Sequence, residues 1–285
     1  MGLTKKQQAR KKELHEKLFA KRARGEAEKP IDASEVQDFL RLAARSHKAF
    51  YHYTSLKALK EMLDEKGPSL RLTRLEGLND LREGGGKEAK ALGRTYVAAF
   101  TWTARESVAM WWMYGLKGNV DPAECVPVRL AFDGEAVRAA VDAVGGEKGQ
   151  KGWKAEMFDV LYQFSARNPK GLGSVIWNRE VANETRCRDK VFRNAAKALP
   201  GFVKDGGWDY EVETRLSIEL PKAAGEHIFI PFGRALKTVK VIVGPGQNAP
   251  LYLEMAKERL AKWGIEVEGS ACEVRFPEWR KKGIG

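Results

Sequence analysis

One late stretch of the chain, residues 210–220, alternates strictly between two kinds of side chain. One set is apolar or weakly polar and consists of Val212, Thr214, Leu216, Ile218 and Leu220. The other set is polar and consists of Glu211, Glu213, Arg215 and Ser217. Because successive side chains of a strand point to opposite faces, this pattern predicts a half-buried strand.

Short strands and helices follow one another along the rest of the chain, without a regular βαβ alternation or an internal repeat. Further strands are predicted at 50–54, 70–73, 95–101, 126–132, 227–231, 238–243, 265–267 and 273–276. Helices are predicted at 3–24, 34–42, 55–66, 103–114, 135–144, 153–164, 181–199 and 251–263. This mixture predicts the α+β class. A single compact domain over residues 31–285 is favoured over two domains.

Positive charge is concentrated at the N-terminus. The chain has 50 Lys and Arg against 38 Asp and Glu, a net charge of +12. Residues 1–30 hold ten of the basic side chains and four of the acidic ones, so half of the excess is local. A basic helical arm of this kind favours polyanions such as nucleic acid through counterion release. The alternative is a solvated helix that only aids solubility.

Composition also excludes several classes of protein. With 43% hydrophobic residues the chain can form a core, and no run of eighteen apolar residues predicts a membrane span. The first thirty residues lack the apolar segment of a secretory signal. Three widely spaced cysteines predict neither a disulfide framework nor a zinc site. We therefore expect a cytoplasmic protein with reduced thiols and no membrane partner.

Paired carboxylates are the strongest chemical signal. Glu211 and Glu213 lie on the polar side of the predicted strand, followed by Arg215. Such a group suits a reaction in which positive charge develops on a sugar, because one carboxylate can bind a ribose hydroxyl and stabilise the cation. The other can orient or deprotonate the acceptor. The alternative is the exposed polar face of an edge strand.

A second polar group lies in the string Phe50-Tyr-His-Tyr-Thr-Ser55. His52 is predicted in the middle of a strand, and Thr54 with Ser55 at the junction to a helix. The imidazole can hydrogen-bond a ribose or an amide, and the helix N-terminus favours a phosphate. The alternative is a core histidine beside an ordinary helix N-cap.

A third candidate region runs from Phe100 to Tyr114. Thr101 and Thr103 share a strand face, and Thr103 with Glu106 is predicted to form a capping box. Trp111 and Tyr114 fall on one face of the following helix, where they can stack on a planar base or nicotinamide. The alternative is an aromatic stripe that packs in the core.

Taken in order, these strings resemble two nested families. Tyr-His-Tyr-Thr-Ser, Leu78-Asn-Asp-x-x-Glu83, Met110-Trp-x-x-Tyr, Trp208-Asp-Tyr-Glu-Val-Glu-Thr-Arg215 and a strand ending in Val-Gly resemble the bacterial family catalogued as domain of unknown function 2971, which is associated with phage defence. More distantly, the chain is similar to the ADP-ribosyltransferases. The match places His52 in their first motif, Thr101 and Thr103 with nearby Tyr114 in the second, and Glu211 with Glu213 in the third.

The resemblance implies a split antiparallel β-sandwich with flanking helices that binds NAD, as a substrate, in its cleft. It implies that Glu213 holds the nicotinamide ribose and that Glu211 activates the acceptor. The implied NAD-binding residues are His52, Tyr53, Thr54, Thr101, Thr103, Trp111 and Tyr114. The expected function is that of a mono-ADP-ribosyltransferase, a toxin or phage-defence effector. RNA or DNA is the expected acceptor, and an antitoxin or regulatory protein is a further expected partner.

Other functions stay open on the sequence alone. A Glu-x-Glu pair also resembles enzymes that modify protein arginine, whereas the basic arm suits nucleic acid. A non-catalytic nucleic-acid-binding module would show salt-sensitive binding without nicotinamide release. A metal-dependent nuclease would use Glu211, Glu213 and Asp80, although these acids lack a two-metal grouping.

Overall fold

The computed structural model describes residues 2–19, 32–63, 67–78, 93–115, 126–145, 152–164, 175–177, 201, 203–246 and 248–272. Its helical elements are α1 (Lys5–Phe19), α2 (Ala33–Ser46), α3 (Leu56–Met62), η1 (Leu75–Gly77), α5 (Val108–Met110), η2 (Trp111–Gly115), α6 (Gly134–Gly145), η4 (Gly206–Glu211), α8 (Gly233–Lys237), α9 (Ala249–Leu260) and η5 (Ala261–Trp263). Its strands are β1 (Ala49–Ser55), β2 (Ser69–Arg74), β3 (Thr95–Thr101), β4 (Pro127–Asp133), β5 (Lys154–Asp159), β6 (Leu161–Phe164), β7 (Val175–Trp177), β8 (Val203–Asp205), β9 (Glu213–Glu219), β10 (His227–Pro231), β11 (Lys240–Val243) and β12 (Glu266–Gly269).

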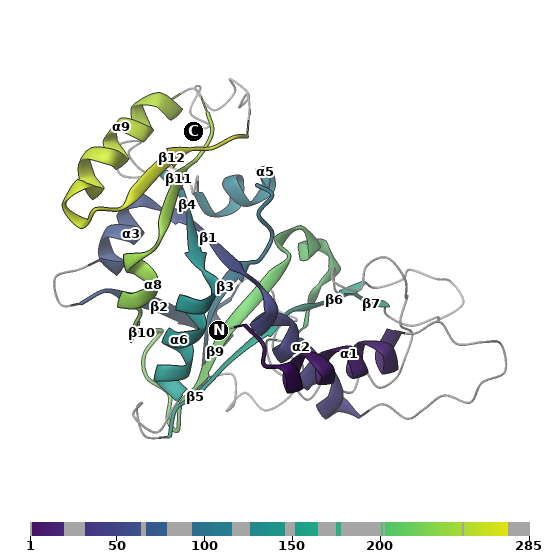
Figure 1. The fold of residues 1–285 in the computed structure, drawn as a ribbon. Coiled ribbons are helices and arrows are strands. Elements are labelled where there is room, and N and C mark those ends of the chain that lie inside the picture. Colours follow the sequence, from purple (N-terminus) through teal and green to yellow (C-terminus); the bar gives the residue numbers. More distant parts are fainter. Residues whose placement is uncertain are drawn as a thin grey trace, which may run out of the picture.

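Within these residues the strands form one sheet of nine and one of three. The large sheet has the order β10-β2-β3-β1-β4-β11-β12, and β9 pairs with both β3 and β5. Its pairings are antiparallel except for β11 with β12. The small sheet has the order β7-β6-β8. Helices flank the large sheet (Figure 1). The predicted α+β class is confirmed.

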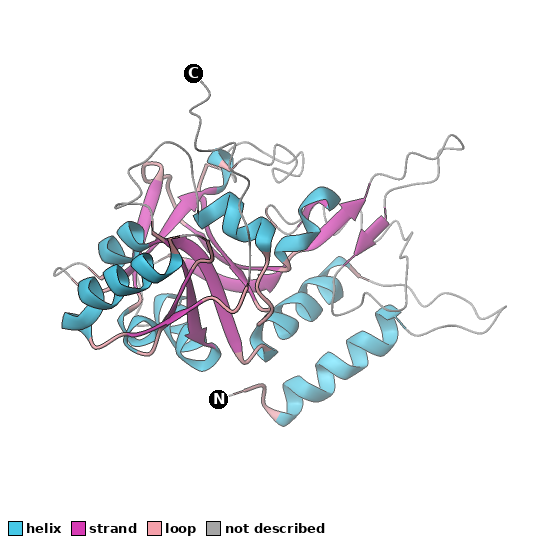
Figure 2. Cartoon of the chain, turned by 90° about the horizontal axis from the view of Figure 1, so that it is seen from above, coloured by secondary structure: helices cyan, strands magenta, loops and turns pink. Residues whose placement is uncertain are grey.

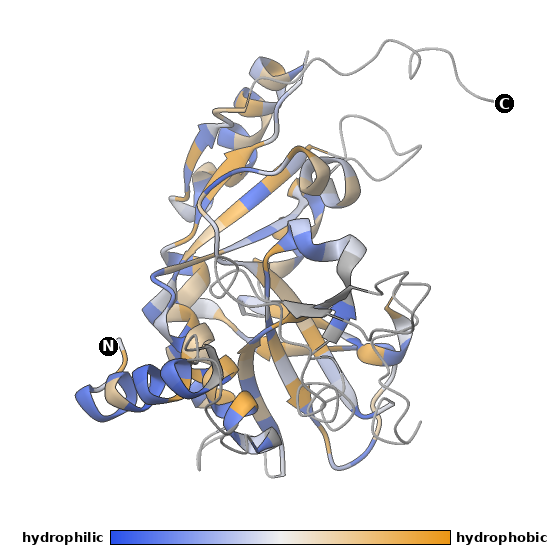
Figure 3. Cartoon of the chain, turned by 90° about the vertical axis from the view of Figure 1, so that its right-hand side faces the viewer, coloured by the Kyte–Doolittle hydropathy of each residue, from blue (hydrophilic) through white to orange (hydrophobic). Residues whose placement is uncertain are grey.

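The core lies between the large sheet and its helices. Helix α2 packs on β5, and α6 packs on β1, β4 and β5. Figure 2 shows helices around the strands, and Figure 3 shows hydrophobic residues concentrated along the strands. In this core the ring of Phe100 packs against those of Phe50 and Phe132. Within the described residues, no helix has both the length and the apolar character that crossing a membrane requires.

The basic N-terminal segment forms a helix that packs against the domain. Helix α1 lies beside α2 (Figure 1), and its Leu14 is completely buried. Lys17 of α1 pairs with Glu35 of α2 at 2.7 Å, and Lys11 donates to the Ser46 hydroxyl at 2.8 Å. The predicted continuation to residue 24 and the end of the arm at residue 30 lie outside the described residues.

Strand β3 is the point at which the large sheet divides. One of its edges pairs along its whole length with β9. The other edge is shared, because β2 pairs with it at Tyr96 and Val97 and β1 pairs with it at Thr101. Between these pairings the chain leaves a gap in the strand ladder. This gap positions the candidate site described below.

The sequence prediction fails for residues 153–164. They form β5 and β6 instead of one helix. Strand β5 pairs with β9 on one side of the sheet and is covered by α2 and α6, so Met157, Phe158 and Asp159 are all buried. Burial on both faces removes the two-residue alternation, and the remaining apolar spacing resembles that of a helix. The helix predicted at 181–199 and the strand at 273–276 lie outside the described residues.

Gly134 allows α6 to begin directly against β1. A Cβ at this position would lie 2.5 Å from the carbonyl oxygen of His47 and 2.7 Å from that of Lys48. Because both atoms belong to the backbone, Gly134→Ala should lower the free energy of unfolding by about 1–3 kcal/mol, measured by urea denaturation. In the control Gly233→Ala, the added Cβ meets no atom closer than 3.8 Å. An equal effect of the two substitutions would contradict this explanation.

Candidate functional site

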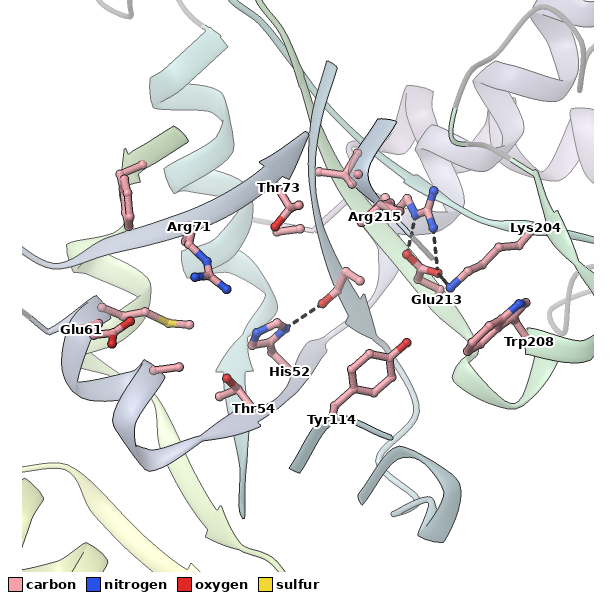
Figure 4. A pocket seen from close by; sticks show the side chains of 18 residues that line it. His52, Thr54, Glu61, Arg71, Thr73, Tyr114, Lys204, Trp208, Glu213 and Arg215 are labelled. Atoms are coloured by element: carbon pink, nitrogen blue, oxygen red, sulfur yellow. Dashed lines mark hydrogen bonds and ion pairs between the residues drawn. The ribbon is translucent and has the colours of Figure 1, made fainter. Parts of the chain in front are cut away.

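A cavity of about 310 Å³ opens where β1 and β2 separate along β3 (Figure 4). Ten elements of the chain contribute to its wall. The lining residues include His52 and Thr54 from β1, Glu61 from α3, Arg71 from β2, Tyr114 from η2, Lys204 from β8, Trp208 from η4, Glu213 and Arg215 from β9, and Phe229 from β10. The early histidine and the late glutamate therefore lie in one cavity. A structure that separated them would have removed the basis for a common site.

His52 lies in the middle of the cavity and fills the gap in the strand ladder. Its Nδ1 lies 2.8 Å from the carbonyl oxygen of Ala99 on β3. A carbonyl oxygen only accepts hydrogen bonds, so Nδ1 is assigned the proton. Burial lowers the pKa of His52, and the charge of Arg71 lowers it further. The neutral ring then keeps an acceptor at Nε2.

Glu213 lies at one end of the cavity, where two cations bind its carboxylate. Arg215 contacts it through Nε and through Nη2, the latter at 3.3 Å, and Lys204 donates to it at 3.0 Å. The backbone N–H of Glu213 donates to the Tyr162 hydroxyl at 2.8 Å. Arg215 also donates to the carbonyl oxygen of Gly201 at 2.9 Å. The side chains of Glu213, Arg215 and Lys204 are all buried.

Glu211 joins this group from outside the strand. The predicted strand begins only at Glu213, because Glu211 ends the 3-10 helix η4 and Val212 has a φ of +48°. A positive φ is unusual for a β-branched residue and marks a strained turn of the backbone. Glu211 accepts hydrogen bonds from the Tyr114 hydroxyl and from Lys204. Lys204 thus connects the two carboxylates.

The predicted half-buried strand and its alternative, an exposed edge strand, are both wrong, because residues 213–216 are buried on both faces of β9. Strand β9 pairs with β3 on one edge and with β5 on the other. Glu211, Glu213 and Arg215 are 3%, 2% and 1% exposed. Charged groups are almost never buried to this degree unless they are paired. The polar side of this strand is therefore an internal cluster of charges that faces a cavity.

The two carboxylates differ in acidity. Burial raises the pKa of Glu211 to about 7, and the nearby charge of Glu213 acts in the same direction. Burial alone would also raise the pKa of Glu213, but Arg215 and Lys204 outweigh burial and lower it to about 2. Burial, followed by the charge of Glu211, raises the pKa of Tyr114 well above its usual value. Tyr114 therefore stays a donor, Glu213 stays ionised, and Glu211 can exchange a proton near neutral pH.

Only some of the predicted site residues line the cavity. His52, Thr54, Tyr114 and Glu213 do so, and Glu211 lies behind them, bonded to Tyr114 and Lys204. The predicted residues Tyr53, Thr101, Thr103 and Trp111 are not among the lining residues.

Trp111 belongs to the core. It is completely buried and packs against Tyr53 with ring centroids 4.8 Å apart. Its Nε1 donates to Glu106 at 3.0 Å. It therefore leaves no ring face open for a stacked ligand. Tyr114, three residues later, reaches the cavity because residues 111–115 form a π-helix, in which the fixed i to i+3 relation of an α-helix does not hold.

The predicted capping box of Thr103 and Glu106 is wrong. Thr103 accepts from the backbone N–H of Arg105 at 3.3 Å, and Glu106 accepts from that of Ala271 at 3.0 Å. Ser107 caps the helix instead, accepting from the N–H of Met110 at 3.4 Å. Glu106 therefore bonds to a segment that is distant in the sequence instead of to the predicted capping partner Thr103.

Among the cavity residues that sequence reasoning missed, four matter most for the charge and shape of the site. Lys204 and Arg71 belong to no recognised motif, and Phe229 was assigned only to a strand. Trp208 was noted only as the start of a string, yet its ring lies 5.0 Å from the Lys204 ammonium. The sequence did contain one signal for Phe229. Buried and exposed residues alternate along β10, and this alternation places a large aromatic side chain on the exposed face of an edge strand.

The charges of the cluster bear on the metal-nuclease alternative. Within the described ranges no group of three or more His, Cys, Asp or Glu side chains is arranged to hold a metal ion. Glu211 and Glu213 are bound by Lys204, and Glu213 also by Arg215. Both carboxylates are therefore already paired with protein cations. Asp80 lies outside the described residues.

The acidity of Glu211 predicts a pH-dependent stability. With its pKa raised in the folded protein to about 7, Glu211 holds a proton there that the unfolded chain releases nearer pH 4.5. This contribution to stability is complete below about pH 4.5 and is lost as the pH rises through 7. The free energy of unfolding of the wild type should therefore fall relative to that of Glu211→Gln over this range.

Urea denaturation at a series of pH values measures this difference. The control is Glu268→Gln, at an exposed position of β12, which should track the wild type at every pH. A constant difference between the wild type and Glu211→Gln from pH 4.5 to 8 would contradict the raised pKa.

Comparison with known proteins gives no relative: no family model matches the chain, and neither a curated protein nor a solved structure is detectably similar to it.

Proposed function

We propose that the protein is an NAD-dependent mono-ADP-ribosyltransferase that modifies nucleic acid. One observation carries the proposal: His52 of β1 and the ionised Glu213 of β9 line the same cavity, on either side of β3. The division of the large sheet at β3 is compatible with the split antiparallel sandwich that the sequence resemblance implies. On this proposal the cavity is the cleft between the two parts of that sandwich.

The acidic end of the cavity suits the nicotinamide ribose. During transfer the bond between ribose C1′ and the nicotinamide nitrogen breaks, its electron pair leaves with nicotinamide, and positive charge spreads over C1′ and the ring oxygen. Glu213 is placed to accept a hydrogen bond from a ribose hydroxyl and to stabilise that charge. Tyr114 supplies the aromatic face beside it, a role for which the buried Trp111 is not suited.

Glu211 suits the second half of the reaction. A lone pair of the acceptor forms the new bond to C1′, and the acceptor then has one proton too many. Glu211, with a pKa of about 7, can take that proton, whereas Glu213 remains a carboxylate. The products are the ADP-ribosylated acceptor, free nicotinamide and one proton.

The opposite end of the cavity suits the remainder of the dinucleotide. Arg71 lines it and has no acidic partner within the described part of the chain, so it is available for the pyrophosphate. His52 Nε2 and Thr54 can bond ribose hydroxyls. Phe229, directly opposite Arg71 on β10, is 57% exposed and offers a face for adenine.

Phe229→Ala should therefore raise the KM for NAD by roughly 2- to 12-fold, the equivalent of one aromatic contact, and leave kcat unchanged. Initial rates of nicotinamide release measure both constants. The matched control is Leu251→Ala, which removes another exposed apolar side chain, 59% exposed on α9. If KM were unchanged in Phe229→Ala, adenine would not bind at this ring.

The acceptor follows from charge. A net charge of +12 and the basic helix α1 favour a polyanionic acceptor, so we assign RNA or DNA. We also assign the protein the role of a toxin or phage-defence effector, as the sequence resemblance implies.

The direct test is incubation with NAD labelled in its adenylate phosphate, together with separate pools of RNA, DNA and protein. We expect release of nicotinamide and label in RNA or DNA. Label in arginine side chains would show that the acceptor is protein, while the proposed reaction would stand. Salt-sensitive binding to nucleic acid without any nicotinamide release would identify a non-catalytic module and overturn the proposal. Glu219→Gln, on the same strand as Glu213 but away from the cavity, serves as the control variant.

A further inference from the structure

Lys204 occupies the centre of the charge cluster. Its ammonium donates to Glu213 at 3.0 Å and also to Glu211, so one cation bridges two buried carboxylates. The residue is 6% exposed, and the ring of Trp208 lies 5.0 Å from the ammonium. It comes from β8, a three-residue strand of the small sheet, and not from the strand that carries Glu213. Chain segments that pair in different sheets thus meet at this nitrogen.

Arg215 makes the role of Lys204 distinct. Arg215 binds Glu213 through two nitrogens, and it sits on the same strand two residues away. Arg215 is the first of the two cations that lower the pKa of Glu213, ahead of Lys204. Lys204 is the cation that also reaches Glu211, so it decides how the second carboxylate is placed and charged.

We propose that Lys204 is a positioning residue, which holds Glu211 beside Glu213 and keeps it able to accept the proton of the acceptor. The inference rests on the proposed function and adds a residue to it. Two buried carboxylates without a bridging cation repel each other, and one of them then keeps its proton. A protonated Glu211 could not act as a base.

Within the described part of the chain, Lys204 is the cation that pairs with Glu211. The charged and titratable groups that face Glu211 are Tyr114 from η2, Tyr162 from β6, Lys204 from β8, Tyr210 from η4 and Glu213 from β9. The three tyrosines are neutral donors or acceptors, and Glu213 is an anion. Lys204, through its charge and its hydrogen bond, and then Tyr114, through its hydrogen bond, favour the ionised form of Glu211, and of these groups Lys204 is the one that carries a positive charge.

The test compares Lys204→Met with Lys204→Arg. Lys204→Met should lower kcat at pH 7 on the order of 10- to 100-fold while the KM for NAD changes less than threefold. Its acid limb in the plot of kcat against pH should move to higher pH, so activity should recover partly in alkaline buffer. Lys204→Arg should restore most of the rate. Lys240→Met, which breaks an exposed ion pair with Glu266, is the matched control.

A readout without activity separates this inference from the proposed function. The difference in unfolding free energy between the wild type and Glu211→Gln changes over the pH range in which Glu211 ionises. When both proteins also carry Lys204→Met, this change should occur at higher pH. If it moves but no variant turns over NAD, the proposed function fails and the role of Lys204 in ionising Glu211 stands. If kcat falls with no shift in either pH profile, Lys204 is merely structural and the inference is overturned.

Discussion

Glu213→Gln should lower nicotinamide release on the order of 100- to 1,000-fold, with little change in the KM for NAD. The reason is that the substitution removes the negative charge facing the developing cation while keeping the shape of the side chain. Steady-state kinetics with purified protein measure this. Glu219→Gln makes the same chemical change six residues further along the strand and should retain the wild-type rate.

The structure adds a cost that the sequence did not indicate. Lys204 and Arg215 are neutralised by Glu213 inside the protein, so Glu213→Gln should also lose some stability. Circular dichroism must therefore show a folded variant before its rate is interpreted. Glu213→Asp keeps the charge and retracts it by one methylene, and it should also be strongly impaired. Turnover near the wild-type value in folded Glu213→Gln would refute the assignment.

Arg215→Met should reduce the free energy of unfolding by about 3–5 kcal/mol, the largest effect on stability that we expect. Arg215 is 1% exposed, and the substitution leaves Glu213 with Lys204 as its remaining cation and leaves the carbonyl of Gly201 without its donor. Urea denaturation at pH 7 is the measurement.

Arg94→Met is the comparison for this prediction. Arg94 pairs with Glu219 at 3.1 Å in a partly exposed position, so its loss should cost at most about 1 kcal/mol. If Arg215→Met does not accumulate in cells, Arg215→Lys keeps the charge without the two-pronged contact and should show an intermediate loss. Equal stability of Arg215→Met and Arg94→Met would show that the buried cluster contributes no more than a surface pair.

Local patterns were enough to predict many elements of the fold. Strand β10 matches its predicted bounds, and Ser55 caps α3 as expected, because adjacent residues carry these signals. Helix α2 begins one residue early, since Asp32 and Glu35 form the capping box there. The prediction failed for elements whose secondary structure depends on contacts with residues distant in the sequence. Residues 153–164 become strands only because β9 and two helices cover them.

The same distinction explains the candidate site. His52 and Glu213 could be selected because the strings around them occur in the order of the family motifs that the chain resembles. Lys204 could not, since a lysine becomes exceptional only when the fold buries it between two carboxylates. Trp111 was selected for the site on α-helical spacing, but it is buried in the core, and residues 111–115 form a π-helix. Spacing predicts a shared face only when the type of helix is known.

The hydrogen bond between His52 and Ala99 has a consequence for how the cavity can change over time. Its acceptor is a main-chain carbonyl, so replacement of the alanine side chain cannot abolish it. The orientation and tautomer of the imidazole instead depend on the gap between β1 and β2 along β3. Substitutions of the surrounding side chains can therefore change which ligands the cavity binds while the orientation of His52 is kept. A change that brought the two strands together would remove this hydrogen bond.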